Sequence, residues 1–176
     1  VIGWNLFGHY LVEIDYDRHR ILLHDSSFVP SDSGSSNIPI EMKRNLPFLS
    51  AHVEVIKGET LPLRVYIDLA SGEALELLTR TDQKYSMPAK LTQHHLGTGL
   101  SGDINGYLGR SVSVRLAGHL LSDIPTAFAP AEVRSKQEGA DGILGNDLLR
   151  RFNLIFDYPH NRLFLKPNGT FKLPFD

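Results

Sequence analysis

Residues 143–167 read ILGNDLLRRFNLIFDYPHNRLFLKP, and residues 1–25 read VIGWNLFGHYLVEIDYDRHRILLHD. An ungapped alignment of the two segments superposes identical residues: Gly3 on Gly145, Leu6 on Leu148, Asp15 on Asp157, Tyr16 on Tyr158, Arg20 on Arg162 and Leu23 on Leu165. Unrelated segments of this composition would share about one or two identities. The match therefore indicates an internal duplication rather than a coincidence of two β-hairpins.

Each copy shows the same local pattern. Two apolar residues and a glycine come first, followed by a short helical stretch over residues 5–10 in one copy and 146–152 in the other. An alternating strand then ends at Asp-Tyr, and a turn leads into a return strand. Asp15 and Asp157 are expected to fix these turns. Because the chain opens with the end of a repeat, we expect residues 1–25 to be the tail of a preceding, similar lobe.

The segment between the copies favours many short strands. Residues 26–37, SSFVPSDSGSSN, are rich in turn-forming residues and indicate a linker. An edge strand is expected over residues 38–42, because proline within it cannot donate to a ladder. Further strands are predicted over residues 49–56, 61–67 and 74–78, with alternation continuing through residues 90–128. We therefore expect a linker and edge strand over residues 26–46, and an all-β lobe over residues 47–176 that closes into a barrel and contains one short helix.

The composition restricts the possible functions. The chain has 176 residues, 41% of them hydrophobic, with 15 glycines and 10 prolines, as in an ordinary turn-rich globular domain. Its net charge of −2 argues against general binding to nucleic acid or anionic membranes, since both need a basic surface. The absence of cysteine excludes disulfides, a thiol nucleophile and cysteine-ligated zinc. No apolar run approaches the roughly 20 residues of a membrane-spanning helix.

One carboxylate stands at the end of an apolar strand. Residues 65–67, Val-Tyr-Ile, run directly into Asp68, and small residues follow at Ala70, Ser71 and Gly72. A carboxylate at the end of a buried strand needs hydrogen bonds to receive it. Small neighbours allow backbone N–H groups to approach, and the Ser71 hydroxyl is a further donor. The simpler alternative is that Asp68 caps a turn.

The order of three segments resembles the retropepsin-like and pepsin-like aspartic protease family, and its bacterial members in particular. In that family a strand ends in Asp-Thr/Ser-Gly-Ala/Ser, a glycine-rich hairpin follows as a flap, and two hydrophobic residues with a glycine form the psi-loop behind the active site. Asp68 matches the catalytic position, with a supporting loop of Leu69, Ala70, Ser71 and Gly72. The flap corresponds to Gly97, Thr98, Gly99, Leu100, Ser101 and Gly102, and the psi-loop to Ile143, Leu144 and Gly145. The resemblance covers residues 47–168 as one lobe and 1–25 as the end of another.

This resemblance implies a peptidase that uses two aspartates, one from each lobe or subunit. Held about 3 Å apart, the two carboxyls share one proton. The charged member deprotonates water and the neutral member protonates the peptide carbonyl. The partner of Asp68 is then an aspartate of a second lobe or of a homodimer partner, and the substrate is a peptide or protein. No metal, organic cofactor or nucleic acid is implied, and the bacterial relatives imply a periplasmic or secreted location.

Two residues depart from the family pattern. Leu69 stands where the family has Thr or Ser, and Ala70 stands where it has Gly. Leu69 cannot form the hydrogen bond that ties the two active-site loops together, and Ala70 adds a methyl group where backbones approach. These departures favour the alternative of a catalytically inactive lobe that binds peptides or mediates assembly.

Other patterns in the sequence favour simpler interpretations. Residues 97–102 also fit G-x-G-x-x-G, but Gly106 and Gly109 disfavour the helix that a dinucleotide site requires. A surface hairpin without function remains an alternative to the flap. His94 and His95 are adjacent on a predicted strand and point to opposite faces, so no metal site is expected there.

Overall fold

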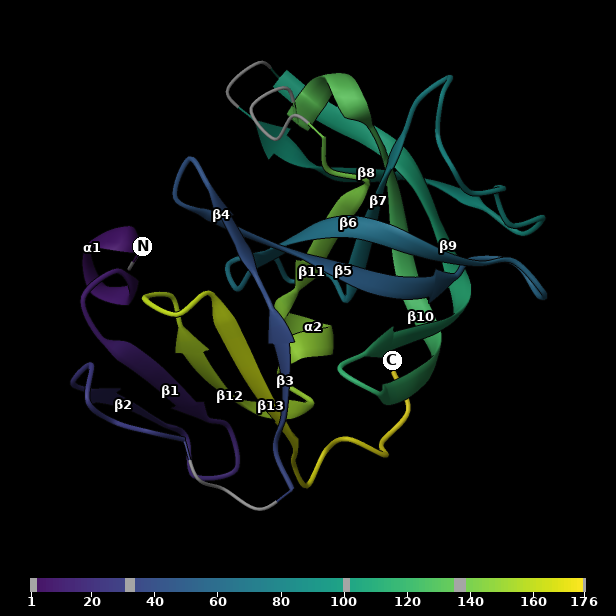
Figure 1. Ribbon diagram of the computed structural model, residues 1–176. Helices are drawn as coiled ribbons and strands as arrows, with labels where there is room; N and C mark the ends of the chain where they lie inside the picture. Colours follow the sequence, from purple (N-terminus) through teal and green to yellow (C-terminus); the bar gives the residue numbers. More distant parts are fainter. Residues whose placement is uncertain (1–2, 31–33, 100–101, 135–138, 176) are drawn as a thin grey trace.

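Two β-sheets make up most of the computed structural model, which describes residues 3–30, 34–99, 102–134 and 139–175 (Figure 1). A five-stranded sheet has the order β2 (Arg20–His24), β1 (Leu11–Asp15), β12 (Phe152–Asp157), β13 (Arg162–Pro167) and β3 (Ser36–Pro39). An eight-stranded sheet has the order β4 (Glu41–Lys43), β5 (Leu46–Glu54), β6 (Thr60–Asp68), β11 (Gly142–Gly145), β7 (Leu75–Thr79), β10 (His119–Pro130), β9 (Gly102–Leu116) and β8 (Thr92–Gly99). The described residues also form two short α-helices, α1 (Trp4–Phe7) and α2 (Asn146–Leu149), and a 3-10 helix, Ala131–Arg134.

The two sequence repeats form equivalent hairpins that pair with each other. Strands β1 and β12 run antiparallel, with Glu13 opposite Ile155 and Val12 opposite Phe156. Glu13 and Ile155 are equivalent positions of the duplication. A local two-fold axis therefore passes between them, and the β1–β2 hairpin is related to the β12–β13 hairpin by that axis.

Both hairpins turn in the same way. His19 and Asn161, which are equivalent in the two repeats, adopt left-handed φ angles of 52° and 54°. The carboxylate before each turn accepts the backbone N–H of the residue three positions on, at 3.1 Å for Asp15 and 3.2 Å for Asp157. The prediction that these two aspartates fix the turns is confirmed.

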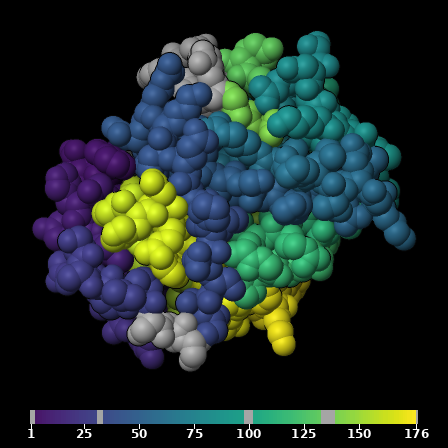
Figure 2. All heavy atoms as spheres, viewed as in Figure 1, coloured from purple at the N-terminus to yellow at the C-terminus, as the bar shows by residue number. Residues whose placement is uncertain are grey.

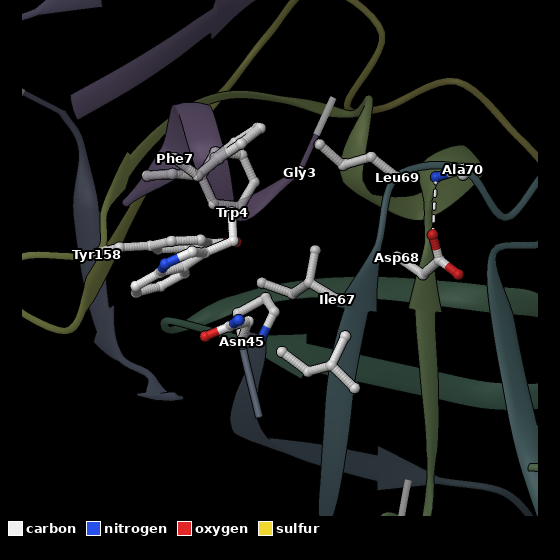
Figure 3. Close-up of a pocket in the computed structure, with 12 residues that line it drawn as sticks. Gly3, Trp4, Phe7, Asn45, Ile67, Asp68, Leu69, Ala70 and Tyr158 are labelled. Carbon is white, nitrogen blue, oxygen red and sulfur yellow. Dashed lines mark hydrogen bonds between the residues drawn. The ribbon is translucent and has the colours of Figure 1, made fainter. Parts of the chain in front are cut away.

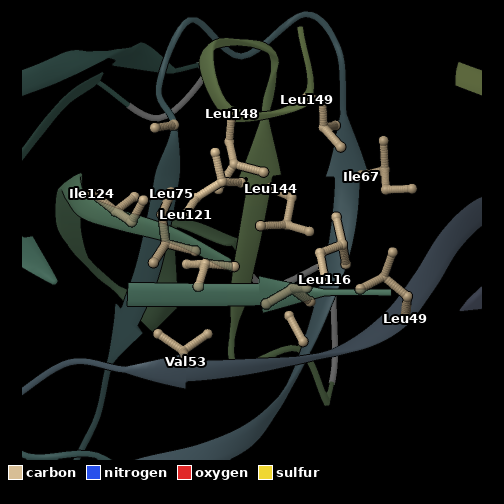
Figure 4. Close-up of a cluster of buried hydrophobic side chains, with 14 of the residues drawn as sticks. Leu49, Val53, Ile67, Leu75, Leu116, Leu121, Ile124, Leu144, Leu148 and Leu149 are labelled. Carbon is tan, nitrogen blue, oxygen red and sulfur yellow. The ribbon is translucent and has the colours of Figure 1, made fainter. Parts of the chain in front are cut away.

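The eight-stranded sheet closes on itself because β5 pairs with β9 as well as with β6. Its interior holds a cluster of buried aliphatic side chains, which includes Leu116, Ile124 and Leu144 (Figure 4). The same core extends onto one face of the five-stranded sheet, where Leu163 and Leu165 are buried. The expectation of an all-β fold is confirmed, and α2 is the short helix expected within the lobe.

Some predicted elements differ in their limits. The edge strand predicted over residues 38–42 divides at Ile40 into β3 and β4, which belong to different sheets, although both lie at a sheet edge as the proline requires. Strand β3 begins at Ser36, within the segment 26–37 that composition favours as a linker. Each α-helix has 4 residues, fewer than predicted. No helix in the described ranges is long and apolar enough to cross a membrane.

Candidate active site

Asp68 is the last residue of β6 and lies beside the end of β11. The two strands run parallel, and their register places Asp68 opposite Gly145. The Asp68 side chain is partly exposed, and its Oδ1 accepts a hydrogen bond from the backbone N–H of Ala70 at 2.9 Å (Figure 3). The fold thus brings the candidate catalytic carboxylate next to the segment that sequence reasoning places behind it.

Backbone hydrogen bonds tie the loop after Asp68 to the start of α2. The N–H of Asn146 donates to the carbonyl oxygen of Ser71 at 2.9 Å. The N–H of Gly145 donates to the carbonyl oxygen of Ala74 at 3.2 Å. The loop is therefore held from behind by main-chain groups, which fixes the direction in which the carboxylate points.

The role expected for the Ser71 hydroxyl is not the one that the structure shows. Ser71 Oγ accepts a hydrogen bond from the backbone N–H of Glu73 at 3.4 Å. The hydrogen bond described for the Asp68 carboxylate comes instead from the main chain of Ala70. The physical reason is local, since a turn after a strand directs the N–H two residues on toward the carboxylate.

Glycine is needed at both ends of β11 because β7 and the loop that leads into it approach the β11 backbone closely. A Cβ atom at Gly145 would lie 2.1 Å from the carbonyl oxygen of Glu73, and one at Gly142 would lie 2.3 Å from that of Glu76. Real Cβ atoms do not approach backbone oxygens so closely, and backbone has little freedom to move in a packed sheet. The glycine pattern of this segment is thus explained by packing against β7 and the loop before it.

The two departures from the family pattern lie side by side on the loop. Leu69 is partly buried and packs against the main core, whereas Ala70 is exposed. The leucine side chain is accommodated as a core residue and offers no hydrogen-bonding group at this position. Any hydrogen bond between this loop and a second loop must therefore use atoms other than the Leu69 side chain.

A pocket of about 180 Å³ opens beside Asp68. It is lined by Gly3, Trp4, Phe7, Asn45, Leu46, Pro47, Ile67, Asp68, Leu69, Ala70, Phe156 and Tyr158. Figure 3 shows the rings of Trp4 and Tyr158 on one side, with Asp68 and Ala70 on the other. Asp68 is the only carboxylate among the described residues that line this mostly apolar pocket.

An aromatic cluster forms the far wall of the pocket. The Tyr158 ring stacks on Trp4 with centroids 6.1 Å apart and lies 5.5 Å from Phe7. Burial raises the pKa of Tyr158 above its ordinary value, so its hydroxyl stays protonated across the physiological range. Sequence reasoning missed this wall, although the equivalence of Gly3 with Gly145 was a signal that α1 corresponds to α2.

Glu73, which sequence reasoning also missed, has a perturbed acidity. Burial raises the pKa of Glu73 above its ordinary value, and the nearby carboxylates of Glu76 and Asp147 add to this rise, while His94 opposes it. His94 lies on β8, in the hairpin that β8 forms with β9.

The hairpin formed by β8 and β9 contains the predicted flap. Gly97, Thr98 and Gly99 end β8, and Gly102 begins β9, while Leu100 and Ser101 lie outside the described residues. Because a strand and not a helix follows Gly102, the dinucleotide alternative is wrong.

The two histidines of β8 are exposed. His95 lies 3.4 Å from Asp103 across the hairpin, from Nε2 to Oδ1. In the described part of the chain, no three His, Asp or Glu side chains gather as metal ligands would. The pair His94 and His95 thus belongs to the surface of the hairpin.

Comparison with solved structures identifies the fold. No family model matches the sequence. Among solved structures, a retropepsin-like aspartic protease from Rickettsia conorii matches with a TM-score of 0.51 and 18% sequence identity, over 74% of this chain and 90% of that chain. The chain has the aspartic protease fold. At this identity the likeness concerns the fold alone.

Two longer proteins also match. An aspartic proteinase from Irpex lacteus has a TM-score of 0.49 and 11% identity, over 88% of this chain and 54% of that chain. Basic 7S globulin from soybean has a TM-score of 0.45 and 12% identity, over 82% of this chain and 53% of that chain. The chain spans about half the length of these two proteins.

Proposed function

We propose that the chain is one lobe of an aspartic-type endopeptidase, in which Asp68 supplies one of two catalytic carboxyls. One observation carries the proposal: the Asp68 carboxylate ends a buried strand, yet it stays partly exposed at the rim of a pocket. A carboxylate with a purely structural role would have its oxygens occupied by neighbouring donors, whereas only one hydrogen bond to Asp68 is described. The second carboxyl comes from another lobe or subunit.

The reaction follows from placing two carboxyls against each other. At about 3 Å they cannot both ionise, so the pair holds one proton, and its titration belongs to the pair rather than to either residue. The ionised member removes a proton from water as the water attacks the peptide carbonyl carbon. The protonated member gives its proton to the carbonyl oxygen. The Ala70 N–H holds one oxygen of Asp68 in place, which leaves the other free for this exchange.

The β8–β9 hairpin acts as the flap in this proposal. It is long, because β9 runs from Gly102 to Leu116, and its tip carries glycines with left-handed φ angles at Gly97 and Gly102. A ribbon of this kind can bend over an extended peptide and bind it through main-chain hydrogen bonds. The substrate is therefore a peptide or a protein segment in extended conformation.

A second candidate function is that of an inactive lobe that binds peptides or mediates assembly. The observation in its favour is the position of Leu69, whose side chain packs into the core and provides no hydroxyl beside Asp68. In this case the pocket and the hairpin would still bind peptides, but no bond would be cleaved.

Cleavage of a mixed peptide library by the complete protein that carries this chain, from acidic to neutral pH, distinguishes the two functions. Asp68→Asn is expected to abolish cleavage and to leave peptide binding in place. Asp82→Asn is the matched control, because the Asp82 side chain is 83% exposed and its nearest cation is 3.6 Å away. Unchanged cleavage by the Asp68 variant would remove this residue from the mechanism. Peptide binding without cleavage by the unaltered protein would support the second function.

A further inference from the structure

The sequence contains two Asn-Gly pairs, Asn105-Gly106 and Asn168-Gly169. In such a pair the backbone nitrogen of the glycine can reach the side-chain amide carbon of the asparagine, because glycine has no side chain to block the approach. Asn105-Gly106 lies inside β9, whereas Asn168-Gly169 directly follows β13. Gly169 is exposed, and the chain end that it begins lies at the lower margin of the molecule, in yellow (Figure 2).

The side chain of Asn168 is folded over the peptide bond that follows it. Its Oδ1 accepts the backbone N–H of Thr170 at 2.9 Å and the Thr170 hydroxyl at 2.8 Å. The other acceptor near this hydroxyl, the carbonyl oxygen of Arg150, is farther away at 3.4 Å. The turn brings Cγ of Asn168 toward the nitrogen of Gly169. Two donors on Oδ1 also stabilise the negative charge that collects there when a nucleophile attacks Cγ.

A carboxylate contacts the second reacting atom, the nitrogen of Gly169. The Gly169 N–H donates to Oδ1 of Asp17 at 3.0 Å. The other oxygen of Asp17 accepts a hydrogen bond from Nδ2 of Asn153, also at 3.0 Å, so the carboxylate is held in place from β12. A Cβ atom at Gly169 would lie only 3.2 Å from Asp17 Oδ1, so glycine permits this close approach. Asp17 is thus placed to take a proton from the Gly169 nitrogen.

We propose that Asn168 is a site of self-modification, at which the backbone nitrogen of Gly169 displaces the side-chain nitrogen of Asn168. The bond from Gly169 N to Asn168 Cγ forms while Asp17 takes the proton of that nitrogen. The bond from Cγ to Nδ2 then breaks, the proton passes through solvent to Nδ2, and ammonia leaves. Water opens the resulting succinimide ring at either carbonyl, which gives aspartate or isoaspartate at position 168. This chemistry does not depend on the proposed peptidase function.

The modification would change how the end of the chain is held. Nδ2 of Asn168 donates to the carbonyl oxygen of Arg150 at 2.8 Å, and a carboxylate has no hydrogen to donate in its place. The new carboxylate would also lie in the same turn as that of Asp17, and like charges repel. Conversion at position 168 should therefore loosen the segment that follows β13.

The other Asn-Gly pair has surroundings that oppose the reaction. In the ladder between β8 and β9, Asn105 lies opposite His95 and Gly106 lies opposite His94. A Cβ atom at Gly106 would lie 2.3 Å from the carbonyl oxygen of Phe128, so the backbone is confined on that side as well. Ring closure at Asn105 requires local opening of the hairpin. The chain therefore contains its own matched control.

Ageing of the 176-residue chain at neutral pH tests the proposal. Peptide mass mapping with separation of the asparagine, aspartate and isoaspartate forms gives the conversion rates at positions 105 and 168. In the folded chain, conversion at position 168 is expected to be at least about tenfold faster than at position 105, because only Asn168 is held against its nucleophile. In the chain unfolded in guanidinium chloride, the two rates should be similar.

Two variants test the groups around Asn168. Asp17→Asn keeps an acceptor for the Gly169 N–H but cannot take its proton, and should slow conversion at position 168 by about tenfold. Thr170→Val removes only the hydroxyl and should slow it by several-fold. Asp82→Asn is the control, because the Asp82 side chain is 83% exposed and should leave the rate unchanged.

Three results would overturn the proposal. One is conversion at position 168 that is no faster than at position 105 in the folded chain. Another is a rate at position 168 that is lower in the folded chain than in guanidinium chloride, since the fold would then protect Asn168. The third is an unchanged rate in both Asp17→Asn and Thr170→Val, which would show that neither group activates the amide.

Discussion

The hydroxyl of Tyr16 donates a hydrogen bond of 2.6 Å to Oδ1 of Asn146. This contact joins the turn after β1 to the first residue of α2, whose own N–H holds the carbonyl oxygen of Ser71. The N-terminal hairpin is therefore coupled to the candidate active-site loop through one side chain. The equivalent tyrosine, Tyr158, packs instead against the ring of Trp4, which replaces the amide at the equivalent helix position.

Removal of this hydroxyl should loosen the coupling. Tyr16→Phe is expected to lower the free energy of unfolding by about 1 kcal/mol, because it deletes one partly buried hydrogen bond and leaves the ring in place. Urea denaturation of the 176-residue chain provides the measurement, with Tyr10→Phe as the control, since Tyr10 is exposed. Equal effects of the two substitutions would show that the hydrogen bond to Asn146 contributes nothing.

The duplication supplies a matched pair of glycines. Gly145→Ala is expected to destabilise the 176-residue chain by roughly 2–4 kcal/mol, because the new Cβ atom would meet the backbone of Glu73. Gly3→Ala, at the equivalent position with open space around it, should change the stability by less than about 0.5 kcal/mol. Thermal unfolding monitored by circular dichroism measures both. A neutral Gly145 variant would contradict the close approach of the Glu73 carbonyl group to the end of β11.

The end of the chain depends on one buried arginine. The guanidinium of Arg151 donates to the carbonyl oxygens of Thr170, Leu173 and Pro174 at 2.9 to 3.1 Å. Arg151→Met should release this segment and destabilise the protein by roughly 2–3 kcal/mol, since charged donors form the stronger hydrogen bonds. Limited proteolysis should then cut after residue 168 at a higher rate. Arg150→Met is the control, because Arg150 is exposed, and equal proteolysis of both variants would contradict the role of Arg151.

Glu73 should make stability depend on pH. Because its folded-state pKa is raised, folding favours the protonated form, and this stability is present below the unfolded-state pKa and is lost as the pH rises through the folded-state pKa. Glu73→Gln should therefore raise the melting temperature at pH 7 and have little effect near pH 3.5. Glu132→Gln, an exposed carboxylate, is the control. A stabilisation of the Glu73 variant that is the same at both pH values would contradict the raised pKa.

The sequence predicts the local structure of this fold well, because local structure follows from short patterns. Alternating apolar residues and the Asp-Tyr turns predict two hairpins, and both exist. That the hairpins pair through Glu13 and Ile155 could not be predicted, because duplication shows which residues are equivalent and not which are in contact. The break at Ile40 was missed for a similar reason, since a strand that changes sheets keeps its extended pattern.

Only those parts of the candidate site that lie within one short segment of the sequence were predicted. Asp68 and the psi-loop at residues 143–145 could be proposed because each is a short motif in one segment, and their roles stay predictions. The aromatic wall of Trp4 and Tyr158 comes from chain segments far apart in sequence, and nothing in either segment alone indicates a pocket. The hydrogen bond from Ala70 to Asp68 uses a main-chain donor, which every residue type offers and which composition therefore cannot reveal.

The axis between β1 and β12 constrains how the two halves of the sheet can evolve. Only positions 13 and 155 face their own equivalents, whereas Val12 faces Phe156 and Ile14 faces Leu154. Val12, for example, lies opposite Phe156, which is the equivalent of Ile14 in the other repeat. Directly opposed side chains on one face of the sheet pack into the same limited volume. In related chains, a larger side chain at position 12 should therefore accompany a smaller one at position 156, so that the two repeats change together.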